Sequence, residues 1–159
     1  AELIEQHLLE TERVQAREKL KQTEAELSET IQQLTGGGQN FALIRSKGDT
    51  ALFGRTTQAM KQKWDIPKNK PLSDFAPTII LKAKDFATEI TIHNARNKEM
   101  QTEGKISQEH VTNNQAVRNT LIDRGITPED LTPEEDVSKV RRRLDSTAKK
   151  SLKKPDSLD

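Results

Sequence analysis

Two basic stretches hold the side chains of this sequence with the clearest capacity for binding chemistry. Residues 45–85 contain nine Lys or Arg against four acids, and residues 139–154 contain eight against the single acid Asp145. Lys and Arg neutralise phosphates and release counterions from nucleic acids, so both stretches are candidate nucleic-acid surfaces. The residues that we predict to contact nucleic acid or a protein partner are Arg45, Lys47, Arg55, Lys61, Lys68, Lys70, Arg141, Arg142 and Arg143.

The same cations have an alternative, structural interpretation. The second basic stretch follows residues 129–136, which hold five acids. Its Lys and Arg side chains would then form a solvated helix face that is partly paired with those carboxylates. Aromatic residues are scarce, four Phe and one Trp, which argues against stacking on single-stranded bases. A helix–turn–helix is disfavoured because the connector at residues 66–71 is long and holds two prolines.

The histidine and asparagine side chains form the other polar group. His110 and Asn114 share one helix face, but no third ligand stands at a matching spacing, so no metal site is predicted. We expect His93 and Asn114 to be buried and to form hydrogen bonds between helices. The remaining members of this group are Asn94 and Asn113.

The usual catalytic and cofactor-binding patterns are missing from the sequence. The chain has no Cys, which excludes disulfides and thiolate chemistry. Gly36–Gly38 fits neither a GxxxxGK[ST] nor a GxGxxG phosphate loop and is interpreted as a helix stop or hinge. No Ser-His-Asp pairing stands out. We therefore expect a protein that is not an enzyme and has no cofactor.

The composition predicts an all-α protein with a small core. Of 159 residues, 31% are hydrophobic and 32% are charged. There is no apolar run as long as a membrane span and no signal-peptide pattern, so we expect a cytoplasmic protein without a membrane partner. The expected parts are a long helix at 1–35, a multi-helix domain at 40–145 and a flexible Lys-rich tail at 146–159.

The first part, residues 1–35, has helix-forming residues and no Gly or Pro. Its thin apolar seam includes Leu9, and Leu20, Leu27 and Leu34 recur every seven residues, as in a coiled coil. The heptad pattern is imperfect, so the helix either packs on its own domain or forms a homodimer through residues 1–34. With no capping residue before Leu3, we expect it to continue an upstream element.

The second part is organised around residues 71–100. Six apolar residues recur there at spacings of three and four, which predicts a helix with one apolar face. A strand remains the alternative, because the TIIL and TEITI runs are rich in β-branched residues. The predicted apolar face consists of Ile79, Ile80, Ala83, Phe86, Ala87 and Ile90.

Capping patterns predict the remaining elements. Residues 41–44 form a short helix or turn, followed by a polar loop at 45–50. Thr56 caps a helix that runs to Trp64, and Ser107 caps a helix that runs to Arg124. Two further helix starts are expected at Thr127-Pro128 and Thr132-Pro133.

Extended stretches of the sequence resemble a known bacterial family. These stretches are IRSKGDTALFG at 44–54, PKNKPLSDFAPT at 67–78, KAKDFATEITIHN at 82–94 and ISQEHVTNNQAVRNTLIDRGITPEDLTPEEDVSKVRRRL at 106–144. They are similar to the C-terminal half of the DinD family, the DNA-damage-inducible protein D. The opening ELIEQHLLETERVQAREKL resembles the helix that follows the family's N-terminal domain. That Bro-N-type domain is absent, so we expect a fragment or a shortened member.

The resemblance implies an SOS-linked protein that binds RecA–single-stranded DNA filaments and antagonises RecA. It implies no catalytic residues. Two alternatives remain open from the residues themselves. One is a module that binds nucleic acid directly, or a phage-type regulatory module, and the other is an oligomerisation domain built on residues 1–34.

Overall fold

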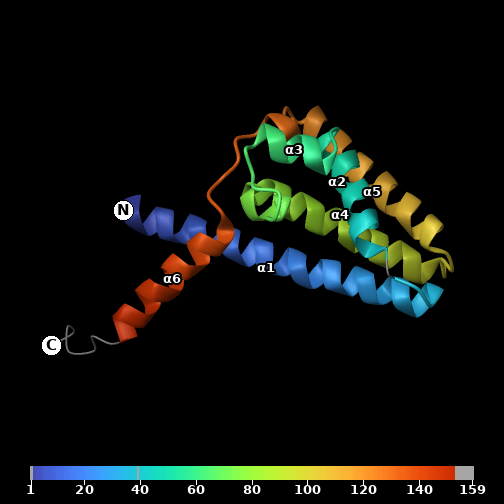
Figure 1. The fold of residues 1–159 in the computed structure, drawn as a ribbon, viewed down its shortest axis with the longest axis horizontal. Coiled ribbons are helices and arrows are strands. Elements are labelled where there is room, and N and C mark those ends of the chain that lie inside the picture. The colour runs from blue at the N-terminus through green and yellow to red at the C-terminus, as the bar shows by residue number, and fades with distance from the viewer. Residues whose placement is uncertain (1, 39, 153–159) are drawn as a thin grey trace.

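The computed structural model describes residues 2–38 and 40–152, and in these ranges the protein is all-α, as predicted (Figure 1). Its elements in chain order are α1 (Glu2–Thr35), α2 (Phe41–Phe53), α3 (Thr57–Lys63), the 3₁₀ helix η1 (Leu72–Phe75), α4 (Thr78–Asn97), α5 (Glu103–Asp123), the 3₁₀ helix η2 (Pro128–Asp130) and α6 (Val137–Leu152). None of the helices within the described ranges is long and apolar enough to cross a membrane.

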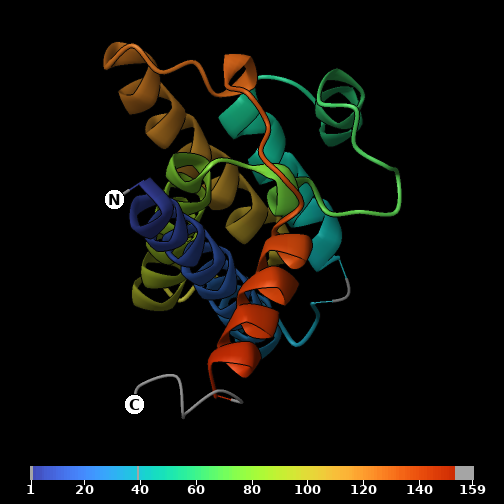
Figure 2. The same ribbon diagram turned by 90° about the vertical axis from the view of Figure 1, so that its left-hand side faces the viewer.

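The helices pack as a layered bundle. The long α1 lies along α4, which also packs on α5, and α2 covers α5 from the other side (Figure 1). The last helix, α6, crosses the first half of α1 and also contacts η1; Figure 2 shows α6 beside α1 from the end where α1 begins. The central helix α4 therefore has neighbours on two sides.

The long N-terminal helix is confirmed, and it packs on its own domain. Leu20, Leu27 and Ile31 are fully buried within the single chain. The predicted seam is wrong at its N-terminal end, because Leu9 is 61% exposed. The first two turns lie beyond the body of the bundle and carry an apolar surface made of Leu3, Ile4, Leu8 and Leu9. The homodimer through residues 1–34 remains a prediction.

Two apolar clusters form the core. The larger joins α1, α2, α3 and α4 around an edge-to-face contact between Phe53 and Trp64, whose ring centroids lie 5.5 Å apart. The smaller joins the C-terminal half of α1 to the ends of α4 and α5 through Ile31, Ile92 and Ile106. If a buried side chain of this size contributes about 1.5–3 kcal/mol, these clusters supply most of the stabilisation of the bundle.

The helix at the centre is confirmed, but its predicted apolar face is only partly buried. Ile80 and Ala87 are fully buried, whereas Ile79 is 46% and Phe86 is 62% exposed. Because α4 packs on both α1 and α5, its buried surface is wider than one apolar stripe and is shifted from the predicted one. It takes in polar residues that the pattern excluded, namely Lys84, Thr88 and Thr91.

The polar loop predicted at residues 45–50 is wrong, because these residues form the middle of α2. Gly48 is the reason that the local pattern misleads. A Cβ atom at Gly48 would lie 2.6 Å from His110 Cδ2 and 2.9 Å from Asn114 Nδ2 of α5. The glycine is therefore required by the close approach of two helices and does not mark a loop.

Replacing Gly48 with Ala is expected to lower the free energy of unfolding by about 1–2 kcal/mol. The added methyl group overpacks the α2–α5 contact, and this cost exceeds the gain in helix propensity. Gly104, in the first turn of α5, is the matched control, because a Cβ atom there meets nothing within 4 Å. We expect Gly104→Ala to raise stability by up to about 1 kcal/mol. Urea unfolding of both variants checks the opposite signs; equal effects would contradict the packing argument.

The start of α5 also differs from the prediction. The helix begins at Glu103, and the Thr102 hydroxyl accepts a hydrogen bond from the Lys105 amide at 3.2 Å. Ser107 therefore lies inside the helix and does not cap it. The helix ends at Asp123, and Gly125 follows with a φ of +84°, which confirms the predicted stop.

The two Thr-Pro sequences do not start long helices. The first gives only η2, and the segment at 131–136, which we call the strap, is extended until α6 begins at Val137. Two of the hydrogen bonds that hold the strap against the bundle involve its backbone and the region between α3 and α4: the Glu134 amide donates to the Phe75 carbonyl at 2.8 Å, and Trp64 Nε1 donates to the Leu131 carbonyl at 3.1 Å. Residues 146–152, predicted to be flexible, belong to α6, and residues 153–159 lie outside the described range.

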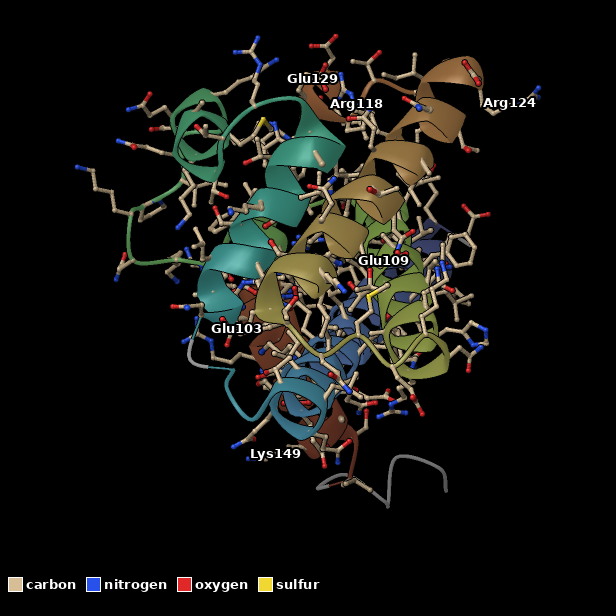
Figure 3. The ribbon with its side chains drawn as sticks, turned by 90° about the vertical axis from the view of Figure 1, so that its right-hand side faces the viewer. Glu103, Glu109, Arg118, Arg124, Glu129 and Lys149 are labelled. Carbon is tan, nitrogen blue, oxygen red and sulfur yellow. The ribbon has the colours of Figure 1, made fainter. Side chains whose placement is uncertain are left out.

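An ion pair fastens the chain just before the strap. The Arg118 guanidinium of α5 donates to both carboxylate oxygens of Glu129, at 2.6 Å and 2.9 Å, and to the Leu52 carbonyl at 2.9 Å (Figure 3). Its hydrogen bonds to Arg118 lower the pKa of Glu129. One side chain thus joins α2, α5 and η2.

Candidate nucleic-acid interface

The nine predicted contact residues lie in two places. Arg45 and Lys47 are on α2, Lys61 is on α3, and Arg55, Lys68 and Lys70 lie in the loops that flank α3. The other three, Arg141, Arg142 and Arg143, are on α6. We call the first group the α2–α3 basic face and the second the α6 basic run.

The α6 basic run is largely engaged within the chain. Arg143 donates to Glu10 of α1 at 2.8 Å and to Glu135 at 3.0 Å. Arg141 pairs with Glu18 of α1. The hydrogen bonds to Arg143 lower the pKa values of Glu10 and Glu135. Two of the three arginines therefore dock α6 onto α1, and Arg142 is exposed.

Lys70, in the loop after α3, also forms an ion pair within the chain, with Asp136 just before α6. Its ammonium lies 2.6 Å from Asp136 Oδ2, while Asp136 Oδ1 accepts the Ser138 amide at 2.9 Å and so caps the helix. Burial alone would raise the pKa of Asp136, but the hydrogen bonds from Lys70 and Ser138 outweigh it and lower the value to about 2. Lys70 is thus part of the packing of the strap.

The remaining five cations of the α2–α3 basic face form no ion pair within the described residues. Arg45 lies over the Phe41 ring at 5.8 Å, and Lys61 donates to the Lys68 carbonyl at 3.2 Å. Lys47 and Arg55 are exposed. A wide depression of about 760 Å³ opens between α2, α3 and the following loop, with Lys61 and Lys68 in its wall. This face therefore keeps its positive charge available to a partner.

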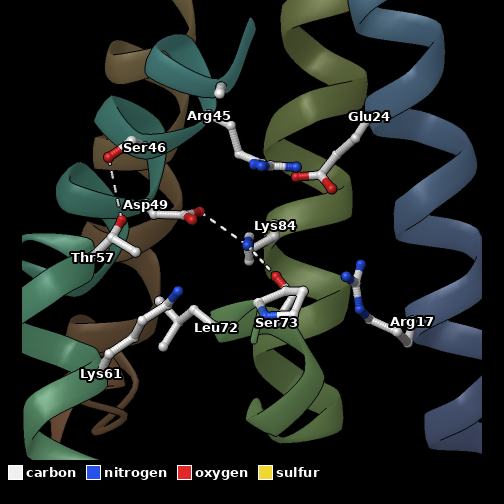
Figure 4. Close-up of a pocket in the computed structure, with 12 residues that line it drawn as sticks. Arg17, Glu24, Arg45, Ser46, Asp49, Thr57, Lys61, Leu72, Ser73 and Lys84 are labelled. Atoms are coloured by element: carbon white, nitrogen blue, oxygen red, sulfur yellow. Dashed lines mark hydrogen bonds and ion pairs between the residues drawn. The ribbon is translucent and has the colours of Figure 1, made fainter. Parts of the chain in front are cut away.

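A second, smaller cavity of about 190 Å³ adjoins this depression and is strongly polar. Arg45 and Lys61 reach its rim, and Lys84 of α4 lies inside, 3.0 Å from Asp49 and hydrogen-bonded to the Ser73 hydroxyl (Figure 4). Lys84 was not among the predicted contact residues. The sequence does contain a signal for it, because a lysine among the apolar residues of a helix indicates a buried charge that needs a partner.

Arg17 of α1 completes the cavity. Its side chain is only 6% exposed, and its Nε donates to Asp74 Oδ1 at 2.8 Å. Its Nη1 is buried and has no acceptor among the described residues. A buried donor without an acceptor costs about 1–3 kcal/mol. Arg17 was also missed from the sequence, where it lies in an evidently polar part of the long helix.

The polar cluster between α4 and α5 agrees only partly with the prediction. Asn114 is buried, as predicted, but its hydrogen bonds go to His110 of the same helix and not to α4. His93 is exposed, and His110 takes the interior position at 5% exposure. His110 Nδ1 lies 2.9 Å from the Thr91 hydroxyl. Burial lowers the pKa of His110 to about 4, with opposing influences of Asp49 and Lys84. No group of three His, Cys, Asp or Glu side chains in the described ranges could hold a metal ion.

Comparison with protein families finds a match over most of the chain. The profile of the DinD C-terminal domain matches residues 8–140, from the second turn of α1 to the first turn of α6. No curated protein and no solved structure matches. The match spans the bundle, the α2–α3 basic face and the polar cavity. The chain therefore belongs to the DinD C-terminal domain family.

Proposed function

We propose that this chain is a non-enzymatic module that binds RecA–single-stranded DNA filaments and inhibits strand exchange. Membership of the DinD family over residues 8–140 is the observation that carries the proposal, since it suggests a role related to DNA damage. The α2–α3 basic face supports the finer assignment. Its unpaired cations suit a polyanionic partner, whose counterions they would release on binding.

The test is a strand-exchange assay with the chain added to preformed RecA filaments. We expect inhibition by the wild-type chain and its loss when Arg45, Lys47 and Arg55 are all replaced with Gln. The matched control replaces three exposed cations elsewhere, Lys98, Lys105 and Arg124, and is expected to inhibit like wild type. Figure 3 shows Arg124 pointing away from the bundle. A wild-type chain that neither binds the filament nor inhibits exchange would refute the proposal.

Direct binding to nucleic acid is the second candidate, and the same unpaired cations favour it. A titration against salt without RecA separates the two. Direct binding predicts that the logarithm of the affinity falls with the logarithm of the salt concentration, by about 0.9 per phosphate neutralised on duplex DNA. Filament-specific binding instead predicts weak binding without RecA.

Self-association through α1 is the third candidate, favoured by the exposed apolar surface of Leu3, Ile4, Leu8 and Leu9. Deleting residues 1–34 would remove Leu20 and Leu27 from the core, so the sharper variant is the double substitution Leu3→Gln with Leu8→Gln. Light scattering should then show a dimeric mass for wild type and a monomeric mass for the double variant. A monomeric wild-type chain would exclude this candidate.

A further inference from the structure

We infer that the polar cavity between α1, α2, α3, α4, Pro71 and the start of η1 is a binding pocket for one phosphate group. The inference goes beyond the proposed function, because the pocket can be filled whether or not the chain binds a RecA filament. It is carried by a buried donor, by unpaired cations at the rim and by the size and charge of the cavity.

The buried donor is Arg17. Its Nε is fixed by Asp74 at 2.8 Å, which orients the guanidinium, while Nη1 has no acceptor within the described part of the chain. The side chain is 6% exposed and lines the cavity. Figure 4 shows the guanidinium pointing from α1 toward Ser73 and Lys84. An oriented guanidinium of this kind is suited to an oxyanion.

The rim adds donors from other directions. Arg45 comes from α2 and Lys61 from α3, and neither forms an ion pair among the described residues. The hydroxyls of Ser46 and Thr57, 3.3 Å apart, lie on the same wall. Donors that converge from three helices match a tetrahedral oxyanion, which accepts hydrogen bonds on all sides, better than a planar carboxylate.

Charge and volume define the group further. Four cations and two carboxylates, Glu24 and Asp49, line the cavity, and Asp74 adds a third carboxylate beside Arg17. Lys84 is already paired with Asp49 at 3.0 Å. The remaining positive excess is small and suits one anionic group of low charge. The volume of about 190 Å³ lies below the roughly 300–1,000 Å³ of sites for drug-sized ligands. The phosphate can belong to a nucleic-acid strand or to a free phosphate compound.

The test uses inorganic phosphate as the probe, with the full chain, at an ionic strength held constant with sodium chloride. We expect phosphate to raise the Tm and to bind in a calorimetric titration. Arg45→Gln and Lys61→Gln should each weaken phosphate binding about tenfold, since each removes a charge-assisted contact. Lys105→Gln, which removes an exposed cation of α5, is the control and should bind like wild type.

A competition experiment separates the two sources of the phosphate. If inorganic phosphate displaces a labelled single-stranded oligonucleotide more than matched chloride does, a strand phosphate occupies the pocket. If phosphate binds without displacing the strand, the pocket takes a free phosphate compound. Either result supports the proposal of a phosphate pocket. The proposal is overturned if phosphate acts no differently from chloride, or if Lys105→Gln weakens phosphate binding as much as Arg45→Gln. The strand-exchange assay remains a separate test of the proposed function.

Discussion

Replacement of Arg13 with Met should lower the free energy of unfolding by about 3–5 kcal/mol, the cost of breaking a buried charged network. Arg13 is 4% exposed, and its guanidinium donates to three backbone carbonyls: Ala76 at 3.0 Å, Glu135 at 2.6 Å and Asp74 at 2.8 Å. One side chain of α1 thus holds the loop before α4 and the strap before α6. Met fills the space of the stem but leaves three carbonyls without their donor.

Two further variants make this expectation specific. Arg13→Lys keeps the charge but cannot donate in three fixed directions, so an intermediate loss is expected. Gln15→Met lies on the exposed side of α1 and should change stability by less than about 0.5 kcal/mol. Urea unfolding followed by circular dichroism gives all three values. A loss below about 1 kcal/mol for Arg13→Met would show that its three hydrogen bonds do not fasten the strap and the chain before α4 to α1.

Local signals were sufficient for much of the fold. The length of α1 followed from a run without Gly or Pro, and it ends at Thr35 just before Gly36, with a φ of +73°. The cap at Thr56 followed from its side chain, whose hydroxyl accepts from the Ala59 amide at 3.1 Å. These features depend on a few neighbouring residues, so they are visible in one sequence.

Where tertiary contacts compete with a local signal, the prediction fails. Gly48 by itself suggests a loop, but it lies in a helix because His110 and Asn114 of α5 occupy the space of a side chain. Thr132-Pro133 is a sound helix start by its residue types, yet the chain stays extended until Val137. The Glu134 amide is used by the Phe75 carbonyl, far away along the chain, instead of by a new helix.

The candidate site was predictable only as a set of charges. The basic runs are evident in the sequence, but their roles depend on which acids lie beside them. Arg141 meets Glu18 across 123 positions and Arg143 meets Glu10 across 133, and no local pattern encodes such pairs. The same holds for Arg17, whose burial depends on α4 and on η1, which contains Asp74. Packing thus divides one class of residues into structural and available cations.

The stability of this protein should fall as the pH is lowered from about 7 to 5, because of His110. Burial lowers its pKa from 6.5 to about 4, so the folded protein holds the neutral imidazole while the unfolded chain binds a proton below about pH 6.5. The contribution of His110 to the free energy of unfolding is complete above the pKa of the unfolded chain, 6.5, and is lost as the pH falls toward 4. The free energy of unfolding is expected to fall by roughly 2 kcal/mol between about pH 7 and pH 5. The loss reaches about 3 kcal/mol once the pH is well below both pKa values.

The hydrogen bonds around the ring explain why protonation is costly. The Thr91 hydroxyl donates to the Ala87 carbonyl at 2.9 Å and therefore accepts from His110 Nδ1. The other ring nitrogen, Nε2, faces the Asn114 amide group at 3.5 Å and the backbone of Gly48. A second proton on Nε2 would meet a donor and a carbon atom instead of an acceptor. The proton must then remain buried without a partner, or the α2–α5 contact must open.

Urea unfolding at several pH values, for wild type, His110→Gln and His93→Gln, checks this expectation. His110→Gln should remove most of the slope between about pH 5 and pH 7, because Gln does not titrate. His93→Gln, at an exposed position of α4, should keep the wild-type slope. The acids with lowered pKa values, Glu129 and Asp136 among them, act below this window, since their ordinary values of 4.5 and 3.8 lie under it. An unchanged slope in His110→Gln would mean that another group controls the pH dependence, and that the α2–α5 contact tolerates a charged imidazole.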